Sequence, residues 1–180
     1  MKFKFSMNRA LIFTVIVAII AAAGIFYYQQ TTPITSYTFY GQDITFRDDL
    51  RSSDAVPIYP DREAVLNTMW NPDIQDVTIV YVNSTDNGIV AVNSFEIAYK
   101  LRIAYLTFNW NVPVYGMEVD SFENLTGSNE NLIIVLVPPS MADETSVEMH
   151  DGAVYIKGKT SQELDRATIK FLMASMNITV

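Results

Sequence analysis

The chain has 180 residues but no cysteine and only one histidine, His150. The missing cysteines exclude disulfides, thiolate metal sites and cysteine nucleophiles, and one histidine is too few for a multi-histidine metal site. The Gly-x-Ser-x-Gly pattern of many serine hydrolases is missing as well. His150 stands beside Asp151-Gly152, where a role in a tight turn is the simpler interpretation. We therefore expect no catalytic residue, no metal and no cofactor, and predict that the chain is not an enzyme.

Charged residues are scarce at the N-terminus, where Lys2, Lys4 and Arg9 are the only ones before position 30. The rest of the chain holds the other nine basic residues and all twenty acidic residues, a formal charge of −11. A body this acidic repels phosphate groups, and its sequence has no basic stripe with interleaved aromatic residues. We therefore expect no nucleic acid among its partners.

Residues 10–28 form a continuous apolar run without a charged residue. As a helix, this run would span about 28 Å, which is close to the hydrocarbon thickness of a bilayer. Tyr27 and Tyr28 end the run, where aromatic side chains favour the membrane interface. The N-terminal cations all precede it, so the positive-inside rule leaves residues 1–9 in the cytoplasm and the acidic body outside. We predict a single-pass protein of the cell membrane that contacts lipid through residues 10–28.

Two other interpretations of this run remain open. The small residues Ala21 to Ala23 could serve as the cleavage site of a secretory signal peptide, although cleavage there would leave an apolar new N-terminus. Arg9-Ala10, which stands before the apolar run, resembles the processing site of archaeal pilins and archaellins. That resemblance implies a pilin-like subunit of a surface filament. Under all three interpretations the body lies outside the cytoplasm.

Residues 29–36 are a short polar connector, and residues 37–180 are expected to form one extracytoplasmic domain. The pattern Asn-x-Ser/Thr begins at Asn83, Asn124 and Asn177. An exported domain can carry N-linked glycans at such positions. Asn83 and Asn124 are the candidate glycosylation sites, whereas Asn177 is disfavoured because it lies close to the C-terminus.

Strands that look buried on both faces alternate with helices along the domain. This alternation predicts an α/β fold: a single compact α/β domain with a mixed sheet and about three helices, in two or three layers. A hairpin at Asp151-Gly152 is expected to supply antiparallel edges. We expect two strands within 36–47, further strands at 56–59, 76–82, 112–119, 132–139, 147–149 and 153–157, and helices at 61–70, 93–110 and 160–175.

The predicted helix at 93–110 is apolar nearly all round. Asn93 and Glu96 have the spacing of a capping box, which places the start of the helix at Asn93. A helix of this kind is either fully buried in the core or buries one face against another chain. Phe95, Tyr99 and Leu106 are therefore candidate residues for contact with a protein partner or for self-association.

Gly158-Lys159-Thr160-Ser161 is similar to the end of a phosphate-binding loop. Such a loop needs four residues between its two glycines, whereas five separate Gly152 from Gly158. Those five alternate like a strand, and Thr160 with Glu163 has the spacing of a capping box. We therefore expect a turn and a helix start here, and no nucleotide.

Asp48 and Asp49 are adjacent carboxylates between Arg47 and Arg51. Paired carboxylates can bind a cation or act as acid and base, but flanking arginines more simply indicate local ion pairing.

We predict a structural or protein-interaction module of the cell envelope. The alternatives are an envelope hydrolase or cation-dependent enzyme that uses acidic residues, and the pilin-like filament subunit.

Overall fold

The computed structural model describes residues 35–123 and 125–180. The predicted stub at 1–9, the membrane segment at 10–28 and most of the connector lie outside these residues. Within them, no helix combines the length and hydrophobicity needed to cross a membrane. In chain order the elements are β1 (Thr35–Phe39), β2 (Gln42–Phe46), α2 (Leu50–Asp54), β3 (Ile58–Tyr59), α3 (Arg62–Met69), β4 (Asp76–Val82), α4 (Asn87–Thr107), β5 (Val114–Val119), β6 (Asn131–Val137), β7 (Ser146–His150), β8 (Ala153–Lys157) and α5 (Ser161–Ser175).

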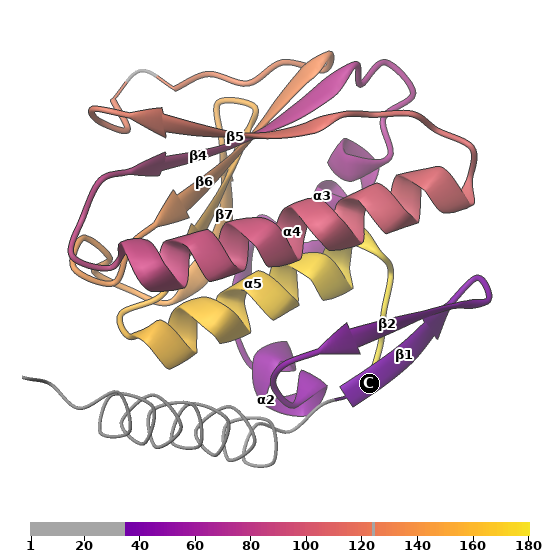
Figure 1. Ribbon diagram of the computed structural model, residues 1–180, viewed down its shortest axis with the longest axis horizontal. Helices are drawn as coiled ribbons and strands as arrows, with labels where there is room; N and C mark the ends of the chain where they lie inside the picture. Colours follow the sequence, from indigo (N-terminus) through magenta and orange to yellow (C-terminus); the bar gives the residue numbers. More distant parts are fainter. Residues whose placement is uncertain (1–34, 124) are drawn as a thin grey trace, which may run out of the picture. The chain divides into compact units, whose positions relative to one another are not determined.

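The predicted α/β fold with a mixed sheet is confirmed (Figure 1). Six strands form one sheet in the order β3-β7-β8-β6-β4-β5, in which only the β7–β8 pair is antiparallel. Asp151 and Gly152 join that pair with φ angles of 50° and 74°, as a type I′ turn requires. The hairpin does not supply an edge of the sheet, because β3 pairs with β7 and β6 pairs with β8. The edges of this sheet are instead the short strand β3 and the longer strand β5.

The described helices lie on one face of the sheet: α4 and α5 contact its strands, and α2 and α3 pack against α5. Side chains of alternate strand residues, such as Val77, Ile79 and Ile134, are buried there in one core together with residues of α3, α4 and α5. Figure 1 shows α4 and α5 running side by side across this face. Burying a side chain of this size stabilises the fold by roughly 1.5–3 kcal/mol. The β-branched runs of the sequence therefore form the strands of the sheet, and the helices pack on one face of that sheet.

The opposite face of the sheet is covered by loops. Val135, Val137 and Ala153 form a small second core there, and Phe122 and Leu125 from the connection between β5 and β6 pack against it. The near-continuous apolar sequence of β6 follows from this arrangement, since its side chains are buried on both faces.

The β1–β2 hairpin packs against the helices on the side away from the sheet (Figure 1). Its inward residues Phe39, Ile44 and Phe46 belong to the main core. The turn at Tyr40 and Gly41 has φ angles of 45° and 85°, which suits a tight two-residue connection. β1 begins at Thr35, so the last two residues of the predicted connector already belong to the domain.

Two helix predictions differ from the structure. Helix α4 begins at Asn87, not at Asn93, so the predicted capping box is wrong. Asn93 is a buried residue inside the helix, and residues 87–92, for which no helix was predicted, form its first turns. The five-residue helix α2 was missed because it is too short to show a periodic pattern. The described part of the chain therefore has four helices where about three were expected.

Candidate functional site

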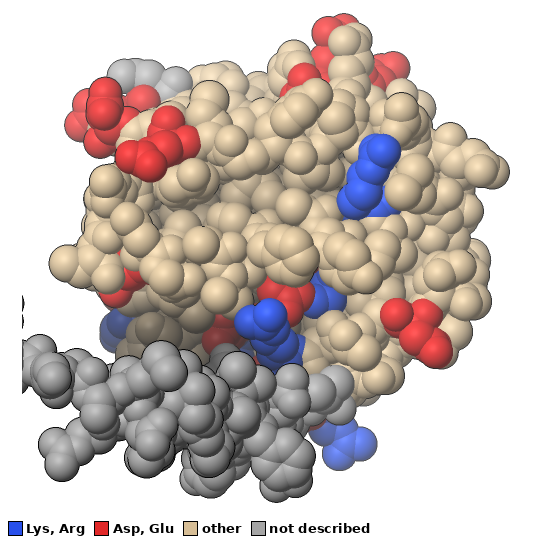
Figure 2. All heavy atoms as spheres, viewed as in Figure 1, with Lys and Arg blue, Asp and Glu red and all other residues tan. Residues whose placement is uncertain are grey.

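Helix α4 presents an apolar stripe to solvent. Phe95, Tyr99 and Leu106, the three predicted partner-contact residues, are 63%, 56% and 50% exposed. Their spacing of four and seven places them on one side of the helix, opposite buried residues such as Ile97 and Leu101. The Phe95 and Tyr99 rings stack with centroids 5.8 Å apart. Figure 2 shows a broad surface almost free of charged side chains where α4 runs in Figure 1.

A groove of about 400 Å³ lies between this stripe and the start of β5. Phe95 and Tyr99 form its helical wall, and Pro113 and Val114 line its other side. Arg102 also lines the groove, but its guanidinium is engaged within the domain. It donates hydrogen bonds of 2.8 Å to the Val112 carbonyl and 2.7 Å to Oδ1 of Asn111. The groove therefore offers mainly apolar surface.

Strand β5 adds a polypeptide edge to the groove. Among the residues that the structure describes, β5 pairs only with β4, so its other side has backbone groups with no strand opposite them. Val114 faces the helices, so Tyr115 and Met117 lie on the other face of the sheet, where they are 55% and 44% exposed. The sequence of β5 contains neither lysine nor proline, two residues that protect many strand edges from pairing. We call the stripe of Phe95, Tyr99 and Leu106, together with the free edge of β5, the α4–β5 surface.

The apolar pattern of residues 93–110 predicts the helical half of the α4–β5 surface, but no local pattern predicts the strand half. The pattern of residues 112–119 predicts a strand, but it does not say whether a neighbour lies on each side. The order of strands in a sheet depends on which distant segments pair. The local sequence of this chain does not predict that pairing.

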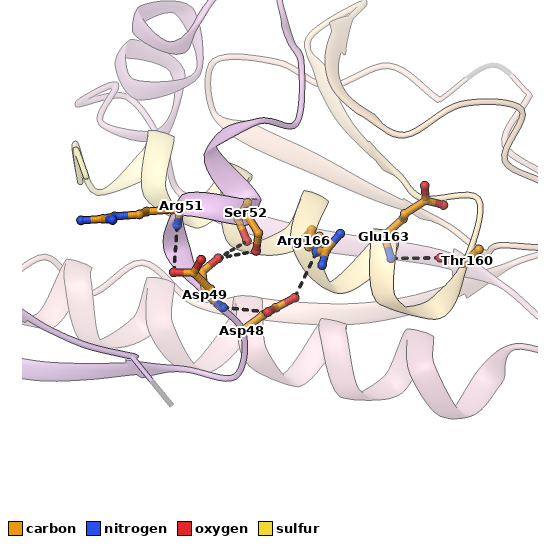
Figure 3. A network of polar contacts seen from close by, with 8 residues as sticks. Asp48, Asp49, Arg51, Ser52, Thr160, Glu163 and Arg166 are labelled. Carbon is orange, nitrogen blue, oxygen red and sulfur yellow. Dashed lines mark hydrogen bonds and ion pairs between the residues drawn. The ribbon is translucent and has the colours of Figure 1, made fainter. Parts of the chain in front are cut away.

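Asp48 and Asp49 have structural partners, as Figure 3 shows. Asp48 accepts a hydrogen bond of 3.2 Å from Nε of Arg166 on α5 and one of 2.7 Å from the backbone nitrogen of Asp49. Asp49 caps helix α2 by accepting from the backbone nitrogen of Arg51. The predicted local ion pairing is therefore wrong in its partners, because the arginine that pairs with Asp48 lies 118 positions along the chain. In the part of the chain that the structure describes, no group of three acidic or histidine residues could hold a metal ion.

Arg47 pairs with helix α4 instead of with its neighbouring aspartates. Its Nε lies 2.9 Å from Oε1 of Glu96, whose other oxygen pairs with Lys100. Lys100 is 3% exposed, and its ammonium lies 5.1 Å from the centroid of the Phe46 ring. Burial, together with the positive charge of Arg47, lowers the pKa of Lys100 to about 8. This buried group joins the hairpin to the helical layer, and no cavity that could admit a substrate adjoins it in the described structure.

A second polar cluster lies on β7 and β8, centred on Glu148. This carboxylate accepts from Ser146 and from Nζ of Lys157 at 2.9 Å, and it lies 2.8 Å from Nε2 of His150. Burial by itself raises the pKa of Glu148, but the hydrogen bonds from Lys157, Ser146 and His150 outweigh it and bring the pKa down to about 2. The carboxylate, not the imidazole, is the central group, so the cluster lacks the order of a catalytic triad. Sequence reasoning missed it because its residues alternate along two strands without a motif.

The candidate glycosylation sites are only partly described. Asn83 is exposed just after β4, and its Oδ1 accepts a hydrogen bond of 2.7 Å from Nδ2 of Asn87. Asn124 lies outside the described residues. Asn177 is exposed directly after α5. Glycosylation at any of them stays a prediction.

No protein-family model, no curated protein and no solved structure matches this chain. Its function is therefore inferred from its own residues. Asp48, Asp49 and Glu148 are each bound to neighbours within the domain, whereas the α4–β5 surface leaves large apolar side chains in water.

Proposed function

We propose that this chain is a single-pass membrane protein whose domain acts, without catalysis, as a protein-interaction module of the cell envelope. Residues 10–28 form the membrane anchor, residues 1–9 stay in the cytoplasm, and the domain lies outside. The uncharged run of nineteen residues and the three cations before it support this topology.

The α4–β5 surface is the observation that carries the interaction role. An exposed side chain as large as Phe95 or Tyr99 gains free energy when a partner removes it from water. Aromatic anchors of this kind dominate the binding energy of many protein interfaces. The two rings already stack on each other and lie on a regular helix, so little conformational entropy is lost when they are covered.

The free edge of β5 defines the kind of partner. We infer that an extended segment of a protein partner adds to the sheet beside β5. Backbone hydrogen bonds to β5 would set its direction, and alternate apolar side chains would lie in the groove against Phe95 and Tyr99. Since Arg102 is engaged within the domain, a partner segment without acidic residues at these positions fits best.

A photoreactive residue in place of Tyr99 tests this role in native membranes with the full-length chain. We expect crosslinks to one defined segment of a partner, located by peptide mass spectrometry, and a loss of these crosslinks when Phe95→Ser is added. The same residue in place of Met141, which is 55% exposed on the loop after β6, is the matched control and should capture little. A segment of a second copy would identify self-association as the form of the interaction. Crosslinks confined to the same chain would contradict the proposal.

The topology needs its own test, and the absence of cysteine makes it simple. Ser36→Cys places a unique thiol on the exposed side of β1, and a membrane-impermeant maleimide should label it on whole cells. Ser6→Cys is the matched control and should be labelled only after the cells are permeabilised. An intact N-terminal mass with Met1 to Ala10 still attached would exclude the pilin-like alternative. Failure of Ser36→Cys to react would count against an external domain.

A further inference from the structure

A pocket of about 740 Å³ lies where the C-terminal ends of α3, α4 and α5 meet the tip of the β1–β2 hairpin. Its volume is in the range of small-molecule sites in proteins. The pocket is separate in its residues from the α4–β5 surface, so what it binds does not depend on the proposed function. Most of its wall is aromatic, with Tyr40, Trp70, Phe108 and Trp110 as the main contributors.

The aromatic rings are held in place before any ligand arrives. Nε1 of Trp70 donates a 2.6 Å hydrogen bond to the Ser175 carbonyl at the end of α5. Phe108 meets the Trp70 ring edge to face at 5.0 Å and the Tyr40 ring at 4.8 Å. A wall of mutually packed rings is rigid, so a ligand that stacks on it loses little affinity to the ordering of side chains.

Three exposed asparagines supply the polar groups of the pocket: Asn67, Asn109 and Asn177. Asn109 follows α4 and Asn177 follows α5, and both have left-handed backbone, with φ angles of 57° and 55°. This conformation ends each helix and fixes where the side chain starts. An amide can donate and accept hydrogen bonds at once, as a hydroxyl can. Oδ1 of Asn177 already accepts a 3.3 Å hydrogen bond from Arg62, so Asn177 offers a ligand mainly its Nδ2 donor.

No charged side chain lines the pocket among the residues that the structure describes. We propose that it binds a neutral carbohydrate, with the C–H face of a sugar ring on the aromatic wall and hydroxyl groups on the amides of Asn109 and Asn177. An alkyl chain fits less well, because it would remove water from the amides without replacing their hydrogen bonds. A proline-rich peptide fits less well, because it offers only carbonyl acceptors and would leave the amide oxygen of Asn109 without a donor.

Tryptophan fluorescence tests this directly, since the chain has only two tryptophans, Trp70 and Trp110, and both line the pocket. The full-length chain is placed in phospholipid nanodiscs, so that no sugar-bearing detergent competes. Maltotetraose, cellotetraose and chitotetraose are the neutral probes, with hexaproline and octanol as comparisons. We expect a saturable change in emission with at least one oligosaccharide. Saturation by hexaproline or octanol alone, or no saturable change with any probe up to about 10 mM, would overturn the proposal.

Variants show whether the pocket itself binds the sugar. Asn109→Gly and Asn177→Gly keep the left-handed backbone while they remove the amide, and each should weaken binding about tenfold. Tyr115→Thr removes an exposed ring from β5, outside the pocket, and should leave the affinity unchanged. Equal oligosaccharide affinity in the wild type and both asparagine variants would contradict the assigned contacts. The two proposals can fail separately. If the photoreactive residue at position 99 captures no partner while the sugar binds normally, the interaction role is wrong and the pocket proposal stands.

Discussion

Nδ2 of Asn93 donates a 2.8 Å hydrogen bond to Oδ1 of Asp165 and thereby joins helix α4 to helix α5. The same amide also donates to the Ile89 carbonyl at 3.0 Å, one turn earlier in α4. Asn93 is only 2% exposed. Burial is the main influence that raises the pKa of Asp165, and the hydrogen bond from Asn93 acts against it. A residue expected to start a helix instead connects two helices across their interface.

Asn93→Ala should therefore destabilise the domain. It leaves the Asp165 carboxylate without this donor, and such a loss costs about 1–3 kcal/mol. The free energy of unfolding can be measured with urea through the emission of Trp70 and Trp110 in the full-length chain in detergent. Asn129→Ala, in an exposed loop, is the control and should change stability by less than about 0.5 kcal/mol. Equal stability of the two variants would show that the amide bond contributes nothing.

Glu148 should make the domain sensitive to acid. Its pKa is about 2 in the folded domain against an ordinary 4.5, so the folded state favours the carboxylate. The stabilisation is complete above pH 4.5 and is lost as the pH falls from there through about 2, because protonation breaks the bonds from Lys157 and His150. Roughly 1 to 3 kcal/mol depends on this group.

Glu148→Gln tests that dependence. The variant should be less stable than the wild type at pH 7, and the difference should shrink as the pH falls from 4.5 towards 2. Urea midpoints measured at several pH values report the difference. The exposed Glu130→Gln should keep the acid dependence of the wild type. A constant gap between Glu148→Gln and the wild type over this range would contradict the assignment.

Gly158 and Gly88 should respond in opposite ways to alanine. A Cβ atom at Gly158 would overlap the backbone nitrogen of Leu164 in the first turn of α5, and overpacking of this kind costs at least about 1–3 kcal/mol. A Cβ atom at Gly88 meets nothing within 4 Å, and in helix α4 alanine is favoured over glycine by about 0.5–1 kcal/mol. Thermal unfolding of the two variants side by side is the measurement. A stable Gly158→Ala variant would mean that the contact between β8 and α5 relaxes easily.

Asp49 should matter as a helix cap and not as a charge. Asp49→Ala removes the acceptor at the start of α2 and should cost about 1 kcal/mol, whereas Asp49→Asn keeps an acceptor and should be nearly neutral. Chemical denaturation of both variants separates the two roles. If Asp49→Asn were as unstable as Asp49→Ala, the negative charge itself would be required. An enzyme that used Asp48 and Asp49 would instead lose turnover in an Asp→Asn double variant that keeps its fold.

The sequence by itself determined the local elements of the domain. Asp151-Gly152 allows the positive φ angles of a tight turn, Thr160 accepts from the backbone nitrogen of Glu163 at 3.2 Å, and the run at 76–82 is a strand. These features depend on neighbours within a few residues, so the local sequence predicts them. Exposure of Phe95 and Tyr99 was one of two outcomes that the apolar pattern of the helix left open.

Only the tertiary structure decided which distant groups meet. Local composition did not indicate that Arg166 pairs with Asp48, that Asn93 lies buried against Asp165, or that β5 is an edge strand. Two tryptophans, 40 positions apart, likewise share one pocket because three helices end at the same place. Such pairings follow from the packing of whole elements around one core, and the spacing of nearby residues does not encode them.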